Sequence, residues 1–264
     1  MKEMTDWYDT WEKVDWKYGS DEKVCKKVKE LIAAGADVNA VNYDDDNQTP
    51  LHMAVENNRV EVIKLLIENG ANVNAQNLND ITPLNWTSFD SKIGAITVLL
   101  ENGADTEIKD MFGRTPLMNA ICSNHEEVAM LLIEAGADVN SLDNNDWSVL
   151  HGAASYCGLD VIRTLLWRRA NINKQNHNGR TALHAAAYSG RADVVRLLIE
   201  NGADISIKDT NGETALDLAI EESHVQHRHV SHTETINVLR DAATKKIAAR
   251  NVNVSSFNNA REHE

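Results

Sequence analysis

Short and long apolar runs alternate along most of the chain, and a polar turn separates the two runs of each pair. The longer runs place apolar residues on one face of a helix, as in Val62, Ile63, Leu66 and Ile67. The shorter runs combine Leu with Ala, as in residues 181–187, and small residues let neighbouring helices approach closely. The pattern therefore predicts pairs of short helices, each pair joined by a tight turn.

This paired pattern has a period of 33 residues. Each unit opens with Thr or Ser, followed two residues later by Leu, at Thr49, Thr82, Thr115, Ser148, Thr181 and Thr214. Most units close with glycine, at Gly35, Gly70, Gly103, Gly136 and Gly202. The first loop carries two extra residues, and Arg169 stands where a further closing glycine is expected.

The residue types at the unit boundaries explain the pattern. A Thr followed by Pro, as at Thr49-Pro50, is typical of a helix N-cap and first helical position. The closing glycines stand where a helix needs a left-handed residue to end. Because one unit cannot bury its apolar face alone, the units are expected to stack into a solenoid.

The sequence Thr-Pro-Leu-His, complete at Thr49 to His52, and the 33-residue period resemble the ankyrin repeat family over residues 21–242. The resemblance implies an all-α solenoid of helix-turn-helix units with β-hairpin-like loops, about seven units with the caps. It also implies that the motif histidines, His52, His151 and His184, bridge adjacent units by hydrogen bonds. No catalytic role is assigned to them.

Three segments follow from this pattern. Residues 1–20 are rich in Trp and Tyr and are interpreted as a capping segment, with a docking segment for a partner as the alternative. Residues 21–242 form the repeat domain, in which about eight residues are inserted between the two helices of the last unit. Residues 243–264 lose the period, and we expect a fraying helix followed by disorder.

Composition limits the possible partners. The chain has 26 Lys and Arg against 40 Asp and Glu, a net charge of -14, which argues against nucleic acid and anionic membranes. It has no apolar run of membrane-spanning length, no signal-peptide pattern and three scattered cysteines. We expect a monomeric protein in the reducing cytoplasm, with the nucleus and delivery into a host cell left open.

No motif for catalysis is present, so we expect no enzyme, no catalytic residue and no cofactor. Two segments are rich in residues that can bind metal ions. Asp44, Asp45 and Asp46 lie in the first loop but lack the alternation of a calcium loop, and we interpret them as a solvated tip. The insert of the last unit offers the weak metal candidates His224, His227, His229 and His232. The alternative function is therefore a metal-binding or regulatory module, although a solvated polar insert is favoured.

The resemblance implies that the hairpin tips and first helices line a concave face that binds a partner protein. Aromatic, arginine and apolar residues gather at the matching positions, and these types dominate binding hot spots. The candidates are Leu78, Ile81, Trp86, Phe89, Met111, Phe112, Arg114, Trp147, Tyr156, His177, Arg180 and Tyr188. Packing between units is the alternative for Trp86 and Phe89. The leading function is a non-catalytic scaffold or adaptor that binds a protein of unknown identity.

Overall fold

The computed structural model describes residues 10–224 and 232–261. The chain divides into two compact units, Met1–Asn144 (unit 1) and Asn145–Glu264 (unit 2). Unit 1 contains η1 (Trp11–Lys13), α2 (Asp21–Ala33), α3 (Pro50–Glu56), α4 (Val60–Glu68), α5 (Pro83–Asp90), α6 (Ile93–Glu101), α7 (Pro116–Cys122) and α8 (Glu126–Glu134). Unit 2 contains α9 (Val149–Tyr156), α10 (Leu159–Trp167), α11 (Ala182–Tyr188), α12 (Ala192–Glu200), α13 (Ala215–Ser223) and α14 (Thr233–Arg261).

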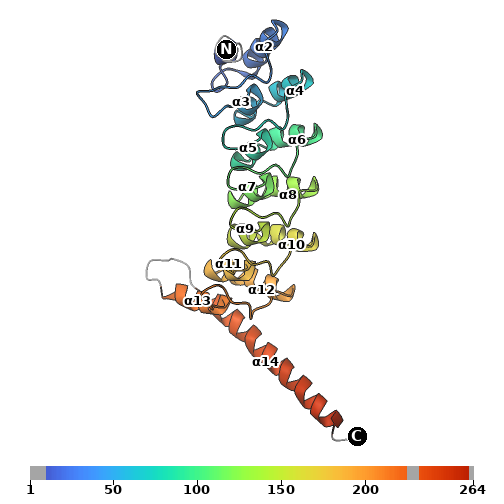
Figure 1. Ribbon diagram of the computed structural model, residues 1–264, viewed down its shortest axis with the longest axis vertical. Helices are drawn as coiled ribbons and strands as arrows, with labels where there is room; N and C mark the ends of the chain where they lie inside the picture. Colours follow the sequence, from blue (N-terminus) through green and yellow to red (C-terminus); the bar gives the residue numbers. More distant parts are fainter. Residues whose placement is uncertain (1–9, 225–231, 262–264) are drawn as a thin grey trace. The chain divides into compact units, whose positions relative to one another are not determined.

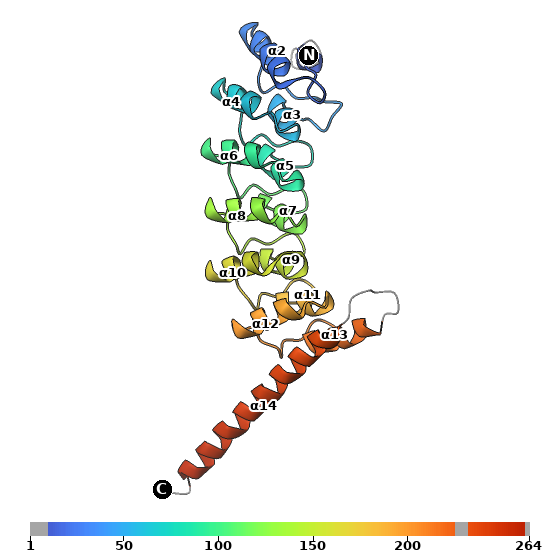
Figure 2. The same ribbon diagram turned by 180° about the vertical axis from the view of Figure 1, so that it is seen from behind.

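Within each unit the helices form two rows, as Figures 1 and 2 show. In unit 1 the first helices α3, α5 and α7 follow one another, and α2, α4, α6 and α8 form the second row. In unit 2 the corresponding rows are α9, α11 and α13, and α10, α12 and α14. No strand occurs in the described residues, where Asn42 and Gln48 form an isolated antiparallel bridge. The predicted all-α stack of helix pairs is confirmed.

The helix boundaries follow the capping signals. All six predicted Thr or Ser residues are the N-caps of first helices, and in the Thr49 repeat the Thr hydroxyl accepts the backbone N–H of His52. Gly35, Gly70, Gly103, Gly136 and Gly202 have positive φ angles between 80° and 94°. Arg169 has φ 69°, so α10 ends with the same left-handed geometry as its counterparts. This conformation costs an Arg about 1 kcal/mol relative to Gly.

The core lies between successive helix pairs. The motif leucines Leu51, Leu84, Leu117, Leu150 and Leu183 are all at most 1% exposed. Burying one such side chain contributes roughly 1.5–3 kcal/mol. Since each first helix packs against the first helix of a neighbouring repeat as well as against its own second helix, each repeat depends on the next for its stability.

The buried motif histidines connect two repeats. His52 Nδ1 accepts the backbone N–H of its N-cap Thr49 at 3.2 Å, so its proton must lie on Nε2, which donates to the carbonyl of Ile81 at 3.0 Å. His151 and His184 make the same bridge to the carbonyls of Arg180 and Glu213. The bridge that the resemblance implied is therefore present in both units.

A second link uses the histidine that precedes a second helix in two of the repeats. In unit 1 the His125 imidazole contacts the carbonyl of Phe89 at 2.8 Å. In unit 2 His232 contacts the carbonyl of Tyr188 at 3.0 Å. His125 and Phe89 are 36 residues apart and His232 and Tyr188 are 44 apart, so the last repeat holds eight extra residues before His232. The size of the predicted insert is confirmed.

The N-terminal segment packs against the first helix pairs of unit 1. Trp11 is fully buried, donates through Nε1 to the carbonyl of Asp37 at 2.8 Å, and stacks on Trp16 with ring centroids 6.3 Å apart. The Arg59 guanidinium ties the segment to α4 by donating to the carbonyls of Trp16 and Gly19. The sequence indicated an atypical helix here, and the described part contains the short 3-10 helix η1. Trp7 and Tyr8 lie outside the described residues.

The C-terminal segment differs from the expectation of disorder. Helix α14 begins at Thr233 and continues to Arg261 (Figures 1 and 2). Residues 242–250 are Ala, Thr, Lys, Ile and Arg, and most of these are good helix formers. The loss of the repeat period after Ala243 therefore marked the end of the apolar pattern and not the end of the helix.

Asn85 replaces the bridging histidine in the Thr82 repeat and is fully buried. Its Oδ1 accepts the Thr82 hydroxyl at 2.6 Å, but its Nδ2 has no hydrogen-bond partner among the described residues. The carbonyl of Arg114, which the bridge would reach, accepts the backbone N–H of Asp110, as the carbonyl of Ile81 accepts that of Asn77. The shorter Asn85 side chain therefore still caps its own helix, but it makes no hydrogen bond to the loop of the next repeat.

We predict that Asn85→His stabilises the protein by about 1 kcal/mol, because it adds one buried hydrogen bond to the next repeat. The matched reverse change, His52→Asn, is expected to cost about 1–3 kcal/mol, because it removes the bridge to the buried Ile81 carbonyl. Urea unfolding midpoints of the two variants measure both effects. If Asn85→His also destabilised the protein, the missing hydrogen bond to the next repeat would not be what distinguishes Asn85 from His52.

The same geometry predicts a pH dependence. Burial lowers the pKa of His52 from 6.5 to about 4, and burial also lowers the pKa of His184. The unfolded chain takes up a proton at His52 below pH 6.5, whereas the folded chain resists it down to about pH 4. Stability from the neutral imidazole is thus complete above pH 6.5 and is lost as the pH falls toward 4.

We expect the free energy of unfolding of the wild type to fall over this interval by about 3 kcal/mol more than that of His52→Asn, which has no imidazole to protonate. Urea titrations at pH 7 and pH 4 measure the fall in the free energy of unfolding for each protein. Equal losses in both proteins would exclude His52 as a source of the pH dependence.

Candidate functional site

The loop that precedes each first helix ends in a hairpin tip shaped by one Asp or Asn. In the tip before α7, Asp110 Oδ1 accepts the backbone N–H groups of Phe112 and Arg114, both at 2.9 Å. Its Oδ2 accepts the Asn119 amide at 3.0 Å, and Gly113 N donates to the Asp110 carbonyl at 2.8 Å. The tight turn at this tip is therefore fixed by a buried carboxylate, and its Met111 and Phe112 side chains are exposed.

Backbone hydrogen bonds join successive tips inside each unit. In unit 1, Leu78 N donates to the carbonyl of Asp46 at 2.8 Å, and Met111 N donates to that of Asn79 at 3.1 Å. In unit 2, His177 N donates to the carbonyl of Asn145 and Thr210 N to that of Asn178. The tips of each unit thus form one continuous, hydrogen-bonded edge.

Large apolar side chains occupy this edge in unit 1. Tyr43, Leu78, Met111 and Phe112 are 42%, 64%, 52% and 59% exposed, and we call them the tip row. Sequence reasoning identified three of them and missed Tyr43. The two extra residues of the first loop hid Tyr43, whose position corresponds to Leu78 in the next repeat and to Met111 in the one after it.

Of the candidates near α5, one is exposed and two are half-buried. Trp86 is half-buried and Phe89 is 38% exposed, and their rings meet edge to face with centroids 6.3 Å apart. Ile81 is half-buried, and its carbonyl receives the His52 bridge. These residues are therefore partly structural, and Phe89 presents the most surface.

Arg114 and the tip residue Phe112 lie together. The Arg114 guanidinium carbon is 5.8 Å from the centre of the Phe112 ring, and its Nε is 3.8 Å from a carboxylate oxygen of the buried Asp143. Arg114 itself is half-buried. The pair presents a ring backed by a cation, with the ring more exposed than the guanidinium.

In unit 2, Trp147 is half-buried, with its ring centroid 5.0 Å from that of the buried His151. Trp147 is therefore less exposed to a partner than its position at a hairpin tip predicted. Tyr156 is 54% exposed at the end of α9. His177 is exposed and its Nε2 lies 3.1 Å from a carboxylate oxygen of Asp146.

Arg180 and Tyr188 form the other group of candidates in unit 2. The Arg180 Nε donates to Asp209 Oδ2 at 3.1 Å, and its guanidinium carbon lies 6.0 Å from the Tyr188 ring centre. Tyr188 is 37% exposed. The structure thus brings Arg180 and Tyr188 together and holds the arginine in place through a buried carboxylate.

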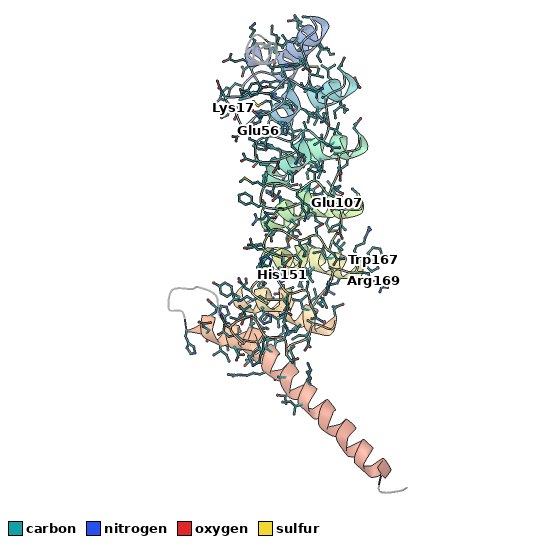
Figure 3. The ribbon with its side chains drawn as sticks, in the orientation of Figure 1. Lys17, Glu56, Glu107, His151, Trp167 and Arg169 are labelled. Carbon is teal, nitrogen blue, oxygen red and sulfur yellow. The ribbon has the colours of Figure 1, made fainter. Side chains whose placement is uncertain are left out.

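Acidic groups surround the first tips of unit 1. Burial, together with the nearby carboxylates of Asp45 and Asp90, raises the pKa of the Glu56 carboxyl. Figure 3 labels Glu56 and Lys17 on the same side of unit 1. The Lys17 and Lys92 ammonium groups lie near enough to Glu56 to oppose this shift, so charges of both signs lie near this end of the tip row.

The histidine insert does not assemble a metal site in the part of the chain that the structure describes. His232 is 2% exposed and bound to the Tyr188 carbonyl, whereas His224 is exposed at the end of α13. His227 and His229 lie outside the described residues. Within residues 10–224 and 232–261, no three His, Cys, Asp or Glu side chains are grouped as metal ligands, the first acidic loop included.

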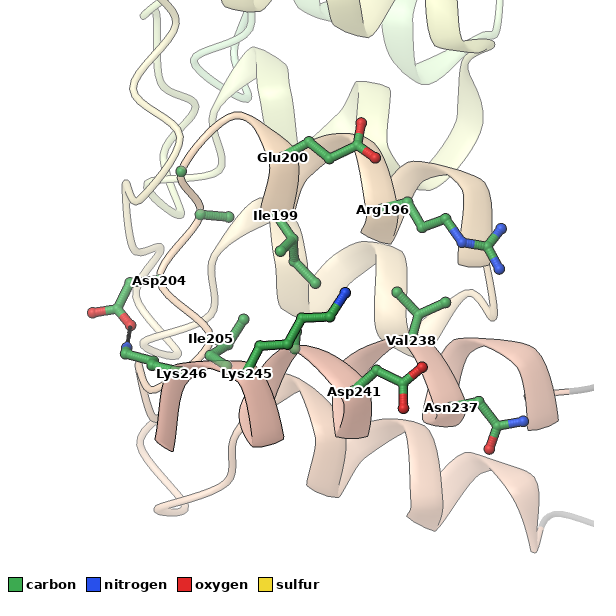
Figure 4. A pocket seen from close by; sticks show the side chains of 13 residues that line it. Arg196, Ile199, Glu200, Asp204, Ile205, Asn237, Val238, Asp241, Lys245 and Lys246 are labelled. Carbon is green, nitrogen blue, oxygen red and sulfur yellow. Dashed lines mark hydrogen bonds and ion pairs between the residues drawn. The ribbon is translucent and has the colours of Figure 1, made fainter. Parts of the chain in front are cut away.

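A groove of about 630 Å³ runs between α12 and α14 in unit 2 (Figure 4). Apolar side chains such as Ile199, Ile205 and Val238 line it, and Lys245 extends across it. The Lys246 ammonium donates to Asp204 at 2.7 Å and holds the pKa of that carboxyl well below its usual range. This groove could not be predicted from the sequence, because it forms beside a helix whose C-terminal part we expected to fray.

Comparison with known proteins identifies the repeat type. A family model described as ankyrin repeats, three copies, matches residues 20–110, 84–176 and 150–247. The Arf-GAP with coiled-coil, ANK repeat and PH domain-containing protein 2 of Rattus norvegicus is 41% identical over 66 residues, which are 25% of this chain and 9% of that protein. The ankyrin repeat and SOCS box protein 5 of Bos taurus is 41% identical over 58 residues, or 22% and 17%. The chain thus spans less than a fifth of these curated relatives.

Solved structures show the same architecture. The human ASB11 ankyrin repeat domain aligns with a TM-score of 0.69 at 27% identity, over 84% of this chain and 94% of that one. The ankyrin repeat domain of Bcl-3 gives 0.69 at 29% identity, also over 84% and 94%. A chain in the structure of a predatory endopeptidase from Bdellovibrio bacteriovorus with an immunity protein gives 0.65 at 29% identity, over 74% and 98%.

Asp110 offers a test of how the tip is held. We predict that Asp110→Ala costs about 1–3 kcal/mol, because it leaves buried donors unsatisfied. The control Asp110→Asn places the residue found at positions 77 and 176 and keeps one acceptor oxygen, so its loss should be smaller. Urea unfolding measures both variants, and equal losses would contradict the role of the carboxylate oxygen in the turn.

Proposed function

Because the chain belongs to the ankyrin repeat family, we propose that it is a non-catalytic scaffold that binds a partner protein through its hairpin tips and first helices. Ankyrin repeats are a general protein–protein interaction module. We assign the contact surface to the tip row of unit 1, with Phe89 and Arg114 beside it, and to Tyr156, His177, Arg180 and Tyr188 in unit 2.

The observation that carries this proposal is the tip row. Four large apolar side chains, more than two-fifths exposed in each case, stand on an edge whose backbone is fixed by hydrogen bonds. A fixed edge loses little conformational entropy on binding, so its exposed apolar area contributes more fully to affinity. Scattered exposed apolar residues need no explanation, but a row at successive tips is typical of an interaction surface.

The neighbours are consistent with this proposal. One structure similar to this chain contains an endopeptidase in complex with an immunity protein. We propose by analogy that this chain also engages a folded protein. The match leaves the identity and activity of that protein open.

The metal-binding alternative is not favoured by any contact in the described residues. The imidazole of His232 is engaged with the Tyr188 carbonyl and replaces in the last repeat the link that His125 makes to Phe89. A metal site would have to displace that link. The alternative stays a prediction from composition.

The proposal is tested by affinity capture with the full chain and the double variant Met111→Ala/Phe112→Ala. Both side chains are exposed, so the variant should fold as the wild type does. We expect loss of at least tenfold in affinity for the captured protein, because these two exposed side chains are half of the tip row. The control Lys64→Ala/Thr97→Ala changes exposed positions on α4 and α6 and should bind normally.

Circular dichroism melting verifies that both variants are folded. Equal binding by wild type and tip variant, or loss of binding in the α4 and α6 control instead, would show that the tip row is not the contact surface.

A further inference from the structure

Unit 2 carries a basic, aromatic surface that the repeat architecture does not require. The second helices close with Glu-Asn-Gly at 68–70, 101–103 and 200–202, and with Glu-Ala-Gly at 134–136. At the same positions α10 closes with Trp167-Arg168-Arg169. One formal negative charge is replaced by two positive charges, and a tryptophan replaces a glutamate. We call these three residues, with Arg163, the Trp-Arg-Arg patch.

The patch lies on the surface and not in the core. Trp167 is 75% exposed, and Arg163, Arg168 and Arg169 are exposed. Arg163 precedes Trp167 by one helical turn, so the two side chains share a face of α10. In Figure 3, Trp167 and Arg169 project from the end of α10, away from α9. The patch therefore belongs to the row of second helices and is separate from the surface proposed above.

The arrangement of the patch is costly for folding. Arg169 takes the left-handed conformation that glycine adopts at the other closing positions of this kind. Trp167 leaves most of a large apolar side chain in water, and the fold does not need it, since the other repeats close without one. The Arg168 guanidinium carbon lies 5.1 Å from the Trp167 ring centre, so the exposed ring is bordered by a cation.

The chemistry of the patch fits an acidic protein segment. Arginine binds carboxylates in a bidentate manner, and an exposed indole with few rotatable bonds is a common binding anchor. An exposed ring bordered by the Arg168 guanidinium, with the exposed Arg163 and Arg169 nearby in sequence, therefore matches a segment in which Asp or Glu flanks an aromatic or apolar side chain. Extended phosphate surfaces are a poorer fit, because the whole chain has a net charge of -14 and would repel them beyond the patch.

We propose that the Trp-Arg-Arg patch is a second interaction surface, which binds an acidic, aromatic-containing segment of a partner protein. It acts independently of the tip row. Its affinity is salt-dependent, because its attraction combines exposed charges with one stacking contact.

The test uses the full chain and the triple variant Trp167→Glu/Arg168→Asn/Arg169→Gly. This variant carries the Glu-Asn-Gly sequence of three other repeats, so it should melt at or above the wild-type temperature. The probe is a fluorescein-labelled random copolymer of Glu and Tyr, and fluorescence anisotropy at low and at physiological salt is the readout. We expect binding by the wild type, at least tenfold weaker binding by the triple variant, and weakening of wild-type binding with salt.

The variant Met111→Ala/Phe112→Ala, which alters the tip row, should bind the copolymer as the wild type does. That arm distinguishes failure of this proposal from failure of the proposed function. Equal copolymer binding by wild type and triple variant, or no binding by either, would overturn the proposal. Binding to phosphatidylserine vesicles or duplex DNA in preference to the copolymer would also overturn it, because the occupant would then be a phosphate surface.

Discussion

The buried imidazole at the start of a first helix is the interaction on which the repeat architecture depends most visibly. One nitrogen of His52 satisfies the N-cap of its own helix and the other satisfies the loop carbonyl of the next repeat. Helix initiation and repeat stacking are thereby coupled through one neutral side chain that water cannot reach. Because no helix pair buries its apolar face alone, this coupling at His52, His151 and His184 reinforces the stacking of neighbouring repeats. Links such as those of His125 and His232 to the preceding repeat add to it.

A scaffold held in this way leaves its variable positions free for function. The carboxylate of Asp110 and its equivalents fix the tips, so Phe112 or Tyr43 can be exposed without loosening the fold. The opposite situation occurs at Asn85, where a departure from the motif lies inside the core and leaves a buried amide unsatisfied. A residue that departs from the repeat motif thus affects binding when it is exposed at a tip, and stability when it is buried between helices. Arg169 belongs to the exposed group, although its backbone carries a stability cost.

Most of the fold was predictable from the sequence because it follows from period and capping. The N-caps, the closing glycines and the eight-residue insert were all readable from spacing, and Arg169 keeps the geometry of the glycine it replaces. The length of α14 could not be predicted in this way, because its C-terminal part has helix-forming residues but no apolar repeat. The tip positions were also readable, but the exposure of each side chain was not. Trp147 lies against His151, and Tyr43 was displaced from register by a longer loop.

In our account, the tips and first helices of unit 1, and not its second helices α4 and α6, meet the partner that the captured complex contains. Hydrogen–deuterium exchange of the full chain, with and without that partner, measures this directly at the backbone. The account predicts slower exchange in the tip segments around residues 43–46, 78–81 and 111–114 and at the C-terminal ends of the first helices, with α4 and α6 unchanged. Protection confined to α4 and α6, with unchanged exchange at the tips, would contradict it.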